Sequence, residues 1–132
     1  MDSNSRITPL IGIVGVCASG KTTLIRRLTK MGYRCRHIAQ EHSYVPTMWF
    51  RITHPDFLIY LQVEYEETIR RKQLDWTMGE YNEQLFRLRD AYAHANVVID
   101  TSRLTLDETI NAIVTQLEKA GIQPPSPSPE RP

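Results

Sequence analysis

The stretch that decides the fold is Gly15-Val16-Cys17-Ala18-Ser19-Gly20-Lys21-Thr22. It fits the pattern G-x-x-x-x-G-K-[ST] at every fixed position, the motif known as Walker A. The residues on either side provide the context that this pattern requires. Residues 10–14 are a short apolar run typical of a strand buried on both faces. Residues 21–31 carry apolar side chains at the spacing of one helix face, so the motif joins a predicted strand to a predicted helix.

The physics of this pattern predicts a phosphate-binding loop. Glycines let the backbone wrap closely, so that successive N–H groups point at one anion, and the helix start adds unpaired amide donors and a positive dipole end. We expect Lys21 to reach the β- and γ-phosphates of ATP or GTP, Thr22 to ligate Mg²⁺, and Thr23 to contact the α-phosphate. The predicted nucleotide-binding residues are Gly15, Val16, Cys17, Ala18, Ser19, Gly20, Lys21, Thr22 and Thr23. A glycine-rich turn that merely connects a strand to a helix is the alternative interpretation.

Strands and helices alternate along the rest of the chain. Apolar runs predict strands at residues 57–63 and 97–99, and residues 34–40, which are mixed in character, give a weaker indication of another strand. Helical periodicity predicts helices at residues 64–72 and 79–95, and a capping box at Thr105 and Glu108 predicts the start of a last helix. This alternation predicts an α/β fold with three layers, in which a parallel sheet linked by right-handed crossovers is flanked by helices on both faces.

Composition limits the remaining possibilities. The 132 residues have the length of one domain, which we expect to span residues 7–122, followed by a Pro/Ser-rich, disordered tail at 123–132. The net charge of +1 gives no argument for nucleic acid, and no apolar run is long enough for a membrane span. The two cysteines, Cys17 and Cys35, make neither a disulfide framework nor a zinc cluster, and the cytoplasm is the expected compartment. The oligomeric state is not indicated.

Four segments give the chain a resemblance to a known family. They are residues 15–22, 55–63, 67–72 and 97–101. The chain resembles the nucleoside and nucleotide kinases of the P-loop class, which have a similar proline–aspartate–strand element before an arginine-bearing lid and a similar Val-Ile-Asp-Thr strand before the last helix. The resemblance covers most of residues 7–117 and implies a P-loop NTPase fold of the kinase type. It also implies transfer of phosphate from ATP–Mg²⁺ to a small acceptor, such as a nucleoside, a nucleotide or a metabolite.

The resemblance also implies roles for residues outside the loop. Arg70 and Arg71 would begin the lid and contact the transferring phosphate, although such a charge cluster also suits a solvated helix face. The segment 72–80, with Trp76 and Gly79, would fold over the site. Residues 100–103 would lie near the nucleotide base.

Glu41 is the candidate for an acidic catalytic partner. It follows the second predicted strand, at the carboxyl edge where ligands of parallel sheets bind, and deoxynucleoside kinases have a catalytic glutamate in a similar place before an aromatic-rich stretch. Glu41 would orient Mg²⁺ through water or accept a proton from a substrate hydroxyl, with His42 as a possible neighbour. A surface glutamate in a loop is the competing interpretation.

Two departures from the family keep a second hypothesis open. Residues 43–56 are too few for the usual substrate-binding insert, and Gln62 stands where similar kinases often have aspartate. The alternative is therefore a nucleotide-binding or ATP-sensing module without phosphotransfer. A GTPase switch is disfavoured because no Asn-Lys-x-Asp sequence is present. Trp49 and Phe50 could stack on a base or be buried beside the sheet, and both interpretations are open. Cys17 could have a redox role or could simply be a small side chain that the loop tolerates.

Overall fold

The structure is a computed structural model that describes residues 8–72 and 75–124. Most of the predicted tail at 123–132 lies outside the described residues, as does the first residue of the predicted domain. No helix in the described ranges is long and apolar enough to cross a membrane.

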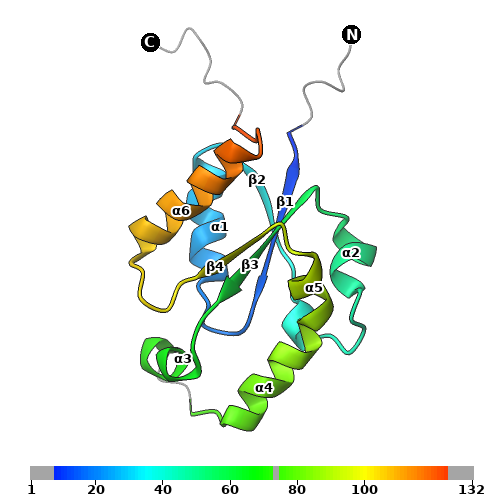
Figure 1. The fold of residues 1–132 in the computed structure, drawn as a ribbon, viewed down its shortest axis with the longest axis vertical. Helices are drawn as coiled ribbons and strands as arrows, with labels where there is room; N and C mark the ends of the chain where they lie inside the picture. The colour runs from blue at the N-terminus through cyan, green and yellow to red at the C-terminus, as the bar shows by residue number, and fades with distance from the viewer. Residues whose placement is uncertain (1–7, 73–74, 125–132) are drawn as a thin grey trace, which may run out of the picture.

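Four parallel strands form one sheet at the centre of the molecule (Figure 1). They are β1 (Leu10–Gly15), β2 (Arg34–His37), β3 (Phe57–Gln62) and β4 (Val97–Asp100), arranged in the order β2-β1-β3-β4. The central strands β1 and β3 are almost entirely buried, as their continuous apolar sequences require, whereas the edge strands β2 and β4 are largely exposed. The predicted α/β class with a parallel sheet is confirmed.

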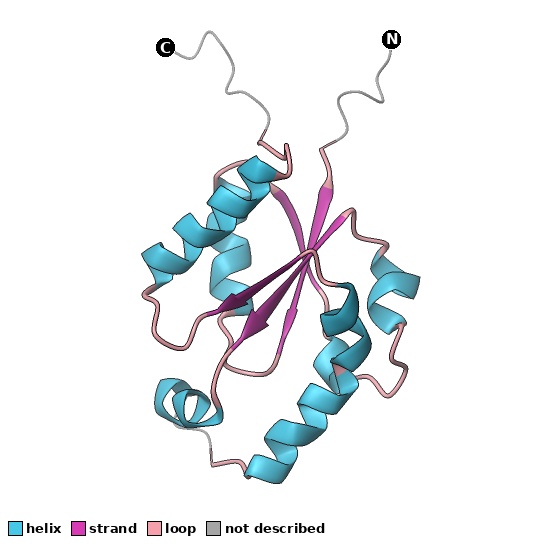
Figure 2. Cartoon of the chain, in the orientation of Figure 1, coloured by secondary structure: helices cyan, strands magenta, loops and turns pink. Residues whose placement is uncertain are grey.

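Helices cover both faces of this sheet (Figure 2). One face is covered by α1 (Lys21–Lys30) and α6 (Leu106–Lys119), and the other by α2 (Met48–Thr53), α4 (Met78–Arg87) and α5 (Arg89–His94). The remaining helix, α3 (Tyr65–Lys72), follows β3 at the carboxyl edge. The predicted capping box is confirmed, because Thr105 accepts a hydrogen bond from the Glu108 amide and Glu108 accepts one from the Thr105 amide.

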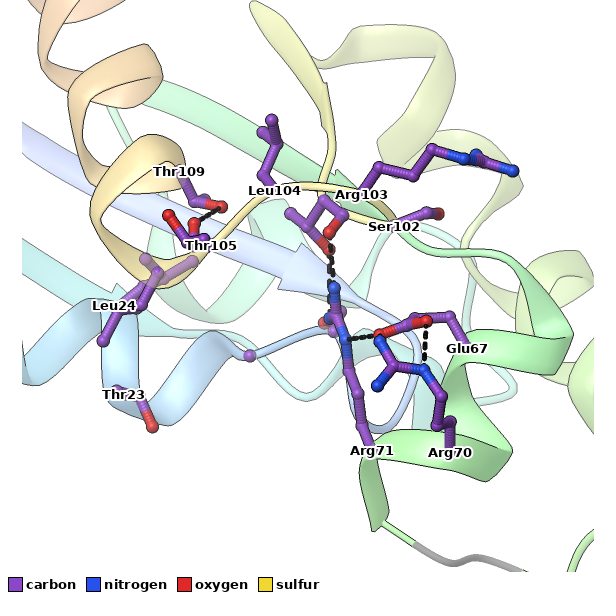
Figure 3. A pocket seen from close by; sticks show the side chains of 14 residues that line it. Thr23, Leu24, Glu67, Arg70, Arg71, Ser102, Arg103, Leu104, Thr105 and Thr109 are labelled. Atoms are coloured by element: carbon purple, nitrogen blue, oxygen red, sulfur yellow. Dashed lines mark hydrogen bonds and ion pairs between the residues drawn. The ribbon is translucent and has the colours of Figure 1, made fainter.

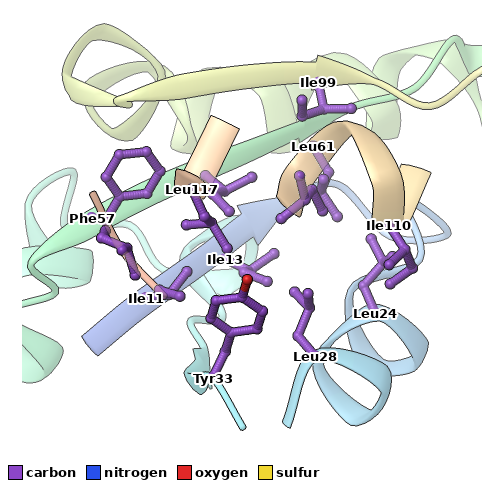
Figure 4. Packing of buried hydrophobic residues seen from close by; sticks show 13 residues of the cluster. Ile11, Ile13, Leu24, Leu28, Tyr33, Phe57, Leu61, Ile99, Ile110 and Leu117 are labelled. Atoms are coloured by element: carbon purple, nitrogen blue, oxygen red, sulfur yellow. The ribbon is translucent and has the colours of Figure 1, made fainter. Parts of the chain in front are cut away.

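The apolar core on the α1/α6 face anchors β1, and with it the loop that follows β1 (Figure 4). Ile11 and Ile13 of β1 are fully buried against Leu28 of α1 and Leu117 of α6. The alternate residue Val14 is buried in the cluster on the other face. Burial of each large apolar side chain contributes about 1.5–3 kcal/mol, so the start of the 15–22 segment is attached to a central strand that is buried along its whole length.

Three elements differ from the prediction. The strand predicted at 34–40 ends at His37, and the next residues form a 3-10 helix, η2 (Gln40–His42). The helix predicted at 79–95 is divided into α4 and α5 at Leu88, whose amide is shared between the carbonyls of Gln84 and Leu85, a local 3-10 tightening. Helix α2 was not predicted. Its Trp49 is buried and donates a hydrogen bond to Asp90, so this indole is part of the core and is not a base-stacking surface.

The proline–aspartate element has a structural role at the opposite edge from the predicted site. Asp56 accepts a hydrogen bond from the Leu10 amide at 2.7 Å, and its own amide donates to the Leu10 carbonyl at 2.8 Å. These two bonds fasten the amino end of β1 to the start of β3.

Candidate phosphate-binding site

The segment from Gly15 to Thr22, here called the 15–22 loop, connects the carboxyl end of β1 to the start of α1. A Cβ atom added to Gly15 would lie 2.7 Å from both the Leu61 carbonyl oxygen and Ser19 Oγ, so only glycine fits where the loop leaves the sheet. Ala18 (φ 68°) and Gly20 (φ 97°) are both in the left-handed region. Such turns gather backbone amides on one side, and the first turn of α1 adds amides that lack an intrahelical acceptor. The loop therefore combines features that anion-binding loops use, while the Cys17 amide donates to Gln84 and the Ser19 amide donates to the Val16 carbonyl.

Lys21 is folded back over this loop and is buried. Its Nζ donates to the carbonyl oxygens of Gly15 at 2.6 Å and Val16 at 3.1 Å, and it lies 3.2 Å from Glu41 Oε2. The Lys21 and Glu41 side chains are only 6% and 4% exposed. The two residues that the sequence placed at the same edge of the sheet are thus a buried ion pair.

Glu41 brings a carboxylate oxygen that the fold does not satisfy. Its Oε2 faces Lys21 and lies 3.6 Å from His42 Nε2. Its Oε1 is buried and has no hydrogen-bond partner among the described residues. Buried polar atoms are nearly always paired, so an exception indicates a place for a ligand, ion or proton donor.

Two cavities meet at the 15–22 loop. The smaller, of about 430 Å³, is lined by both members of the ion pair, by Thr22 and Thr23 of α1, and by His37 of β2. Burial and the nearby Lys21 ammonium lower the pKa of His37. The larger cavity, of about 490 Å³, lies between α1, α3 and the segment that joins β4 to α6 (Figure 3). Residues 101–103, three of the four residues expected near the nucleotide base, line it, and Gly20, Thr23 and Arg71 line both cavities.

The two predicted arginines occupy different environments. Arg71 donates to the Ala18 carbonyl oxygen at 3.1 Å and to Thr101 Oγ1 at 3.1 Å, so it joins the 15–22 loop to the end of β4. Arg70 is paired with Glu67, and its side chain is 75% exposed at the rim of the larger cavity. Hydrogen bonds from Arg70, and then from Arg71, lower the pKa of the Glu67 carboxyl. Arg71 is therefore the arginine that contacts the loop directly.

The lid interpretation of residues 72–80 is tested only in part. Residues 73 and 74 lie outside the described ranges. Trp76 packs against the core cluster of the α4/α5 face, and its Nε1 donates to Thr68 Oγ1 at 2.9 Å. In this structure Trp76 is therefore docked on α3.

Two sets of contacts around the 15–22 loop and the two arginines were missed by sequence reasoning. Gln84 of α4 accepts a hydrogen bond from the Cys17 amide at 3.0 Å and donates to Cys17 Sγ at 3.2 Å. Gln84 is a polar residue on the apolar stripe of its helix, four residues before Leu88. A polar side chain at such a position needs a buried partner, and this pattern could have indicated the contact from sequence alone. Glu67 stands three and four residues before Arg70 and Arg71, the spacing of helical ion pairs.

No family model matches this chain, and no curated protein matches it. What the structure itself defines is an α/β domain with a four-stranded parallel sheet. At the carboxyl edge of that sheet, a buried Lys21–Glu41 pair lies beside a glycine-containing loop.

Proposed function

We propose that this chain is a small P-loop protein of the kinase type. It binds ATP or GTP with Mg²⁺ at the 15–22 loop and transfers the γ-phosphoryl group to a small acceptor. The observation that carries this proposal is the buried carboxylate of Glu41, 3.2 Å from the Lys21 ammonium, in the wall of a cavity that the 15–22 loop also lines. Phosphoryl transfer to a hydroxyl needs a cation that neutralises phosphate charge and a base that accepts the hydroxyl proton, close to each other.

The phosphates are held by backbone and by Lys21. The amides of the loop and of the first turn of α1 donate to the phosphate oxygens, and the Lys21 ammonium exchanges its carbonyl contacts for the β- and γ-phosphates. The larger cavity, with Leu24 and Leu104 in its wall, accommodates the nucleoside.

Thr22 fits Mg²⁺, because its hydroxyl is a hard oxygen ligand, is exposed, and lines the same cavity as Lys21 and Glu41. When bound with the nucleotide, Mg²⁺ would neutralise part of the phosphate charge that develops during transfer.

In the transfer step, an oxygen of the acceptor attacks the γ-phosphorus while the bond to the β–γ bridging oxygen breaks and the nucleoside diphosphate leaves. Glu41 accepts the proton of the acceptor hydroxyl. Arg71, already bonded to the loop at Ala18, is placed to stabilise the charge on the transferring group.

The test is a screen of nucleosides, nucleotides and small hydroxylated metabolites for acceptor-dependent release of the nucleoside diphosphate. We expect one chemical class to stimulate release. We also expect Glu41→Gln to lower turnover by about 10²–10⁴-fold, the usual contribution of a general base, with a change of less than about tenfold in nucleotide affinity. Turnover unaffected by Glu41→Gln would remove Glu41 from the mechanism.

A second candidate function is a nucleotide-binding module without transfer. It is favoured by the short connection between β2 and β3, which contains only η2 and the six-residue helix α2 and so offers little surface for an acceptor. Calorimetry distinguishes the two functions: saturable binding of ATP or GTP, with no acceptor able to stimulate hydrolysis or transfer, supports the module.

A further inference from the structure

We infer a second cation site, made by Cys17, Glu41 and His42, for a zinc-type ion. One ligand atom from each residue, the Cys17 sulfur, a Glu41 carboxylate oxygen and a His42 ring nitrogen, lies within 4.8 Å of the other two. Cys17 comes from the 15–22 loop, and the other two residues come from η2. The site is distinct from the Thr22 position assigned to Mg²⁺.

The elements that carry these ligands are fixed by two buried amide side chains. Gln84 holds Cys17 through its amide and its sulfur, at 3.0 and 3.2 Å. Gln40, which is fully buried at the start of η2, donates to the carbonyls of Val45 and Arg87 and accepts from the Trp49 amide at 2.7 Å. Gln84 contacts a ligating atom directly, as the outer partners of metal ligands do, whereas Gln40 fixes the backbone around η2.

An independent observation points to a ligand. Glu41 is 3% exposed, and its Oε1 has no hydrogen-bond partner within the part of the chain that the structure describes. Lys21 is close to Oε2. His42 Nε2 lies 3.6 Å from this same Oε2, so a cation in the cluster would either share Oε2 with Lys21 or bind Oε1 after the carboxylate turns.

The donor set selects the class of ion. A thiolate, an imidazole and a carboxylate suit zinc and similar borderline-soft divalent ions, whereas Mg²⁺ prefers oxygen alone. With zinc bonds of about 2.0–2.3 Å, the ligand atoms of a tetrahedral site lie roughly 3.3–3.6 Å apart. The ligand atoms of Cys17, Glu41 and His42, which lie within 4.8 Å of one another, must therefore approach by about 1 Å to bind the ion. The His42 side chain is 59% exposed and can make that movement. Three protein ligands leave one position open for water or another small ligand.

One consequence rests on the proposed function. Because Glu41 would be both the base for transfer and a ligand of this ion, a zinc-type ion should inhibit phosphoryl transfer even when Mg²⁺ is in excess. The existence of the site does not depend on this consequence.

The experiment uses Co²⁺ as a spectroscopic probe, titrated into the full chain with a phosphine reductant and without nucleotide. We expect one equivalent to give the charge-transfer absorption of a thiolate–cobalt bond, and Zn²⁺ to abolish it. Cys17→Ser should remove the band, His42→Gln should weaken Co²⁺ affinity by at least about tenfold, and the matched control Cys35→Ser should retain the band. Circular dichroism confirms that each variant is folded.

The inference is overturned if the folded wild-type protein gives no band, or if Cys17→Ser retains it. Calorimetry of ATP–Mg²⁺ binding to the wild-type protein, with no added Co²⁺ or Zn²⁺, tests the proposed function separately. A cobalt band without nucleotide binding leaves the metal site standing and removes the kinase. Nucleotide binding and phosphoryl transfer without a cobalt band support the kinase and remove the metal site.

Discussion

The Lys21–Glu41 pair determines what single substitutions can reveal. Both charges are almost fully removed from water, and removal of one partner leaves the other buried and uncompensated, at a cost of about 3–5 kcal/mol. A loss of nucleotide binding in a single variant would therefore be mixed with a loss of stability. Replacement of both residues separates the two effects.

We expect Lys21→Met to lower the free energy of unfolding by about 3 kcal/mol and to weaken ATP binding by at least about 100-fold, since hydrogen bonds to a charged group contribute about 1.5–3 kcal/mol each. The double variant Lys21→Met/Glu41→Gln should recover much of the stability but not the binding. Urea denaturation and calorimetry measure the two quantities, and Lys30→Met, at an exposed position of the same helix, is the control. Wild-type affinity in the double variant would refute the assignment of the phosphate site.

A second prediction at this scale concerns Cys35, whose pKa is raised to about 11 by burial. At pH 8 roughly one thiol in a thousand would be ionised, against about one in four to one in ten for an ordinary cysteine. We expect iodoacetamide to alkylate Cys35 at least about 50-fold more slowly than a free cysteine peptide. Peptide mass spectrometry measures the rate, and labelling of Cys35 at the peptide's rate would show that the thiol is not buried in solution.

Among individual elements, the two best-capped helices illustrate what local sequence can and cannot predict. The box at Thr105 and Glu108 was predicted and is present. The same T-x-x-E spacing at Thr77 and Glu80 also forms a capping box, and it starts α4 one residue earlier than periodicity indicated. Helix α2 has only six residues and too short a pattern to detect, and its place depends on contacts with Gln40 and Asp90 that are distant in sequence.

We expect Thr105→Ala to destabilise the protein by about 1 kcal/mol, because the amide of Glu108 loses its acceptor. Thr105→Ser should retain most of the stability. Thermal unfolding measures both variants. The control is Thr115→Ala, at an exposed position within α6, where better helix propensity should make the change neutral or slightly stabilising. Equal losses at both positions would show that the cap is not the cause.

For the whole molecule, the order β2-β1-β3-β4 explains why the site was only partly predictable. Lys21 lies at the start of the helix after β1 and Glu41 in the short helix after β2, so their meeting at one edge of a parallel sheet followed from the alternation of elements. The contact of Gln84 with Cys17 joins residues 67 apart and depends on which face α4 covers. The division of roles between Arg70 and Arg71 depends likewise on the position of Thr101 at the end of β4. Periodicity in sequence carries no information on either.

Two buried titratable side chains, Tyr60 and Cys35, should make the folded protein less stable at alkaline pH. Burial raises the pKa of Tyr60 to about 12 and that of Cys35 to about 11, from ordinary values of 10.0 and 9.0 that apply to the unfolded chain. The unfolded chain therefore loses these protons first, so the free energy of unfolding is at its full value below about pH 9 and falls as the pH rises toward 12. Urea denaturation at pH 7, 9 and 10.5 measures the fall. Cys35→Ala and Tyr60→Phe should each flatten it, and an unchanged slope in both variants would contradict this account.

Figure 1 shows the start of β1 and the end of α6 at the same end of the molecule, opposite the carboxyl edge that carries the 15–22 loop. A fluorophore, purification handle or surface tether attached beside the start of β1 or the end of α6 therefore lies at the amino edge of the sheet, away from the loop. Protein immobilised there should keep the 15–22 loop facing the solution, which suits surface-based tests of the proposed nucleotide and metal binding.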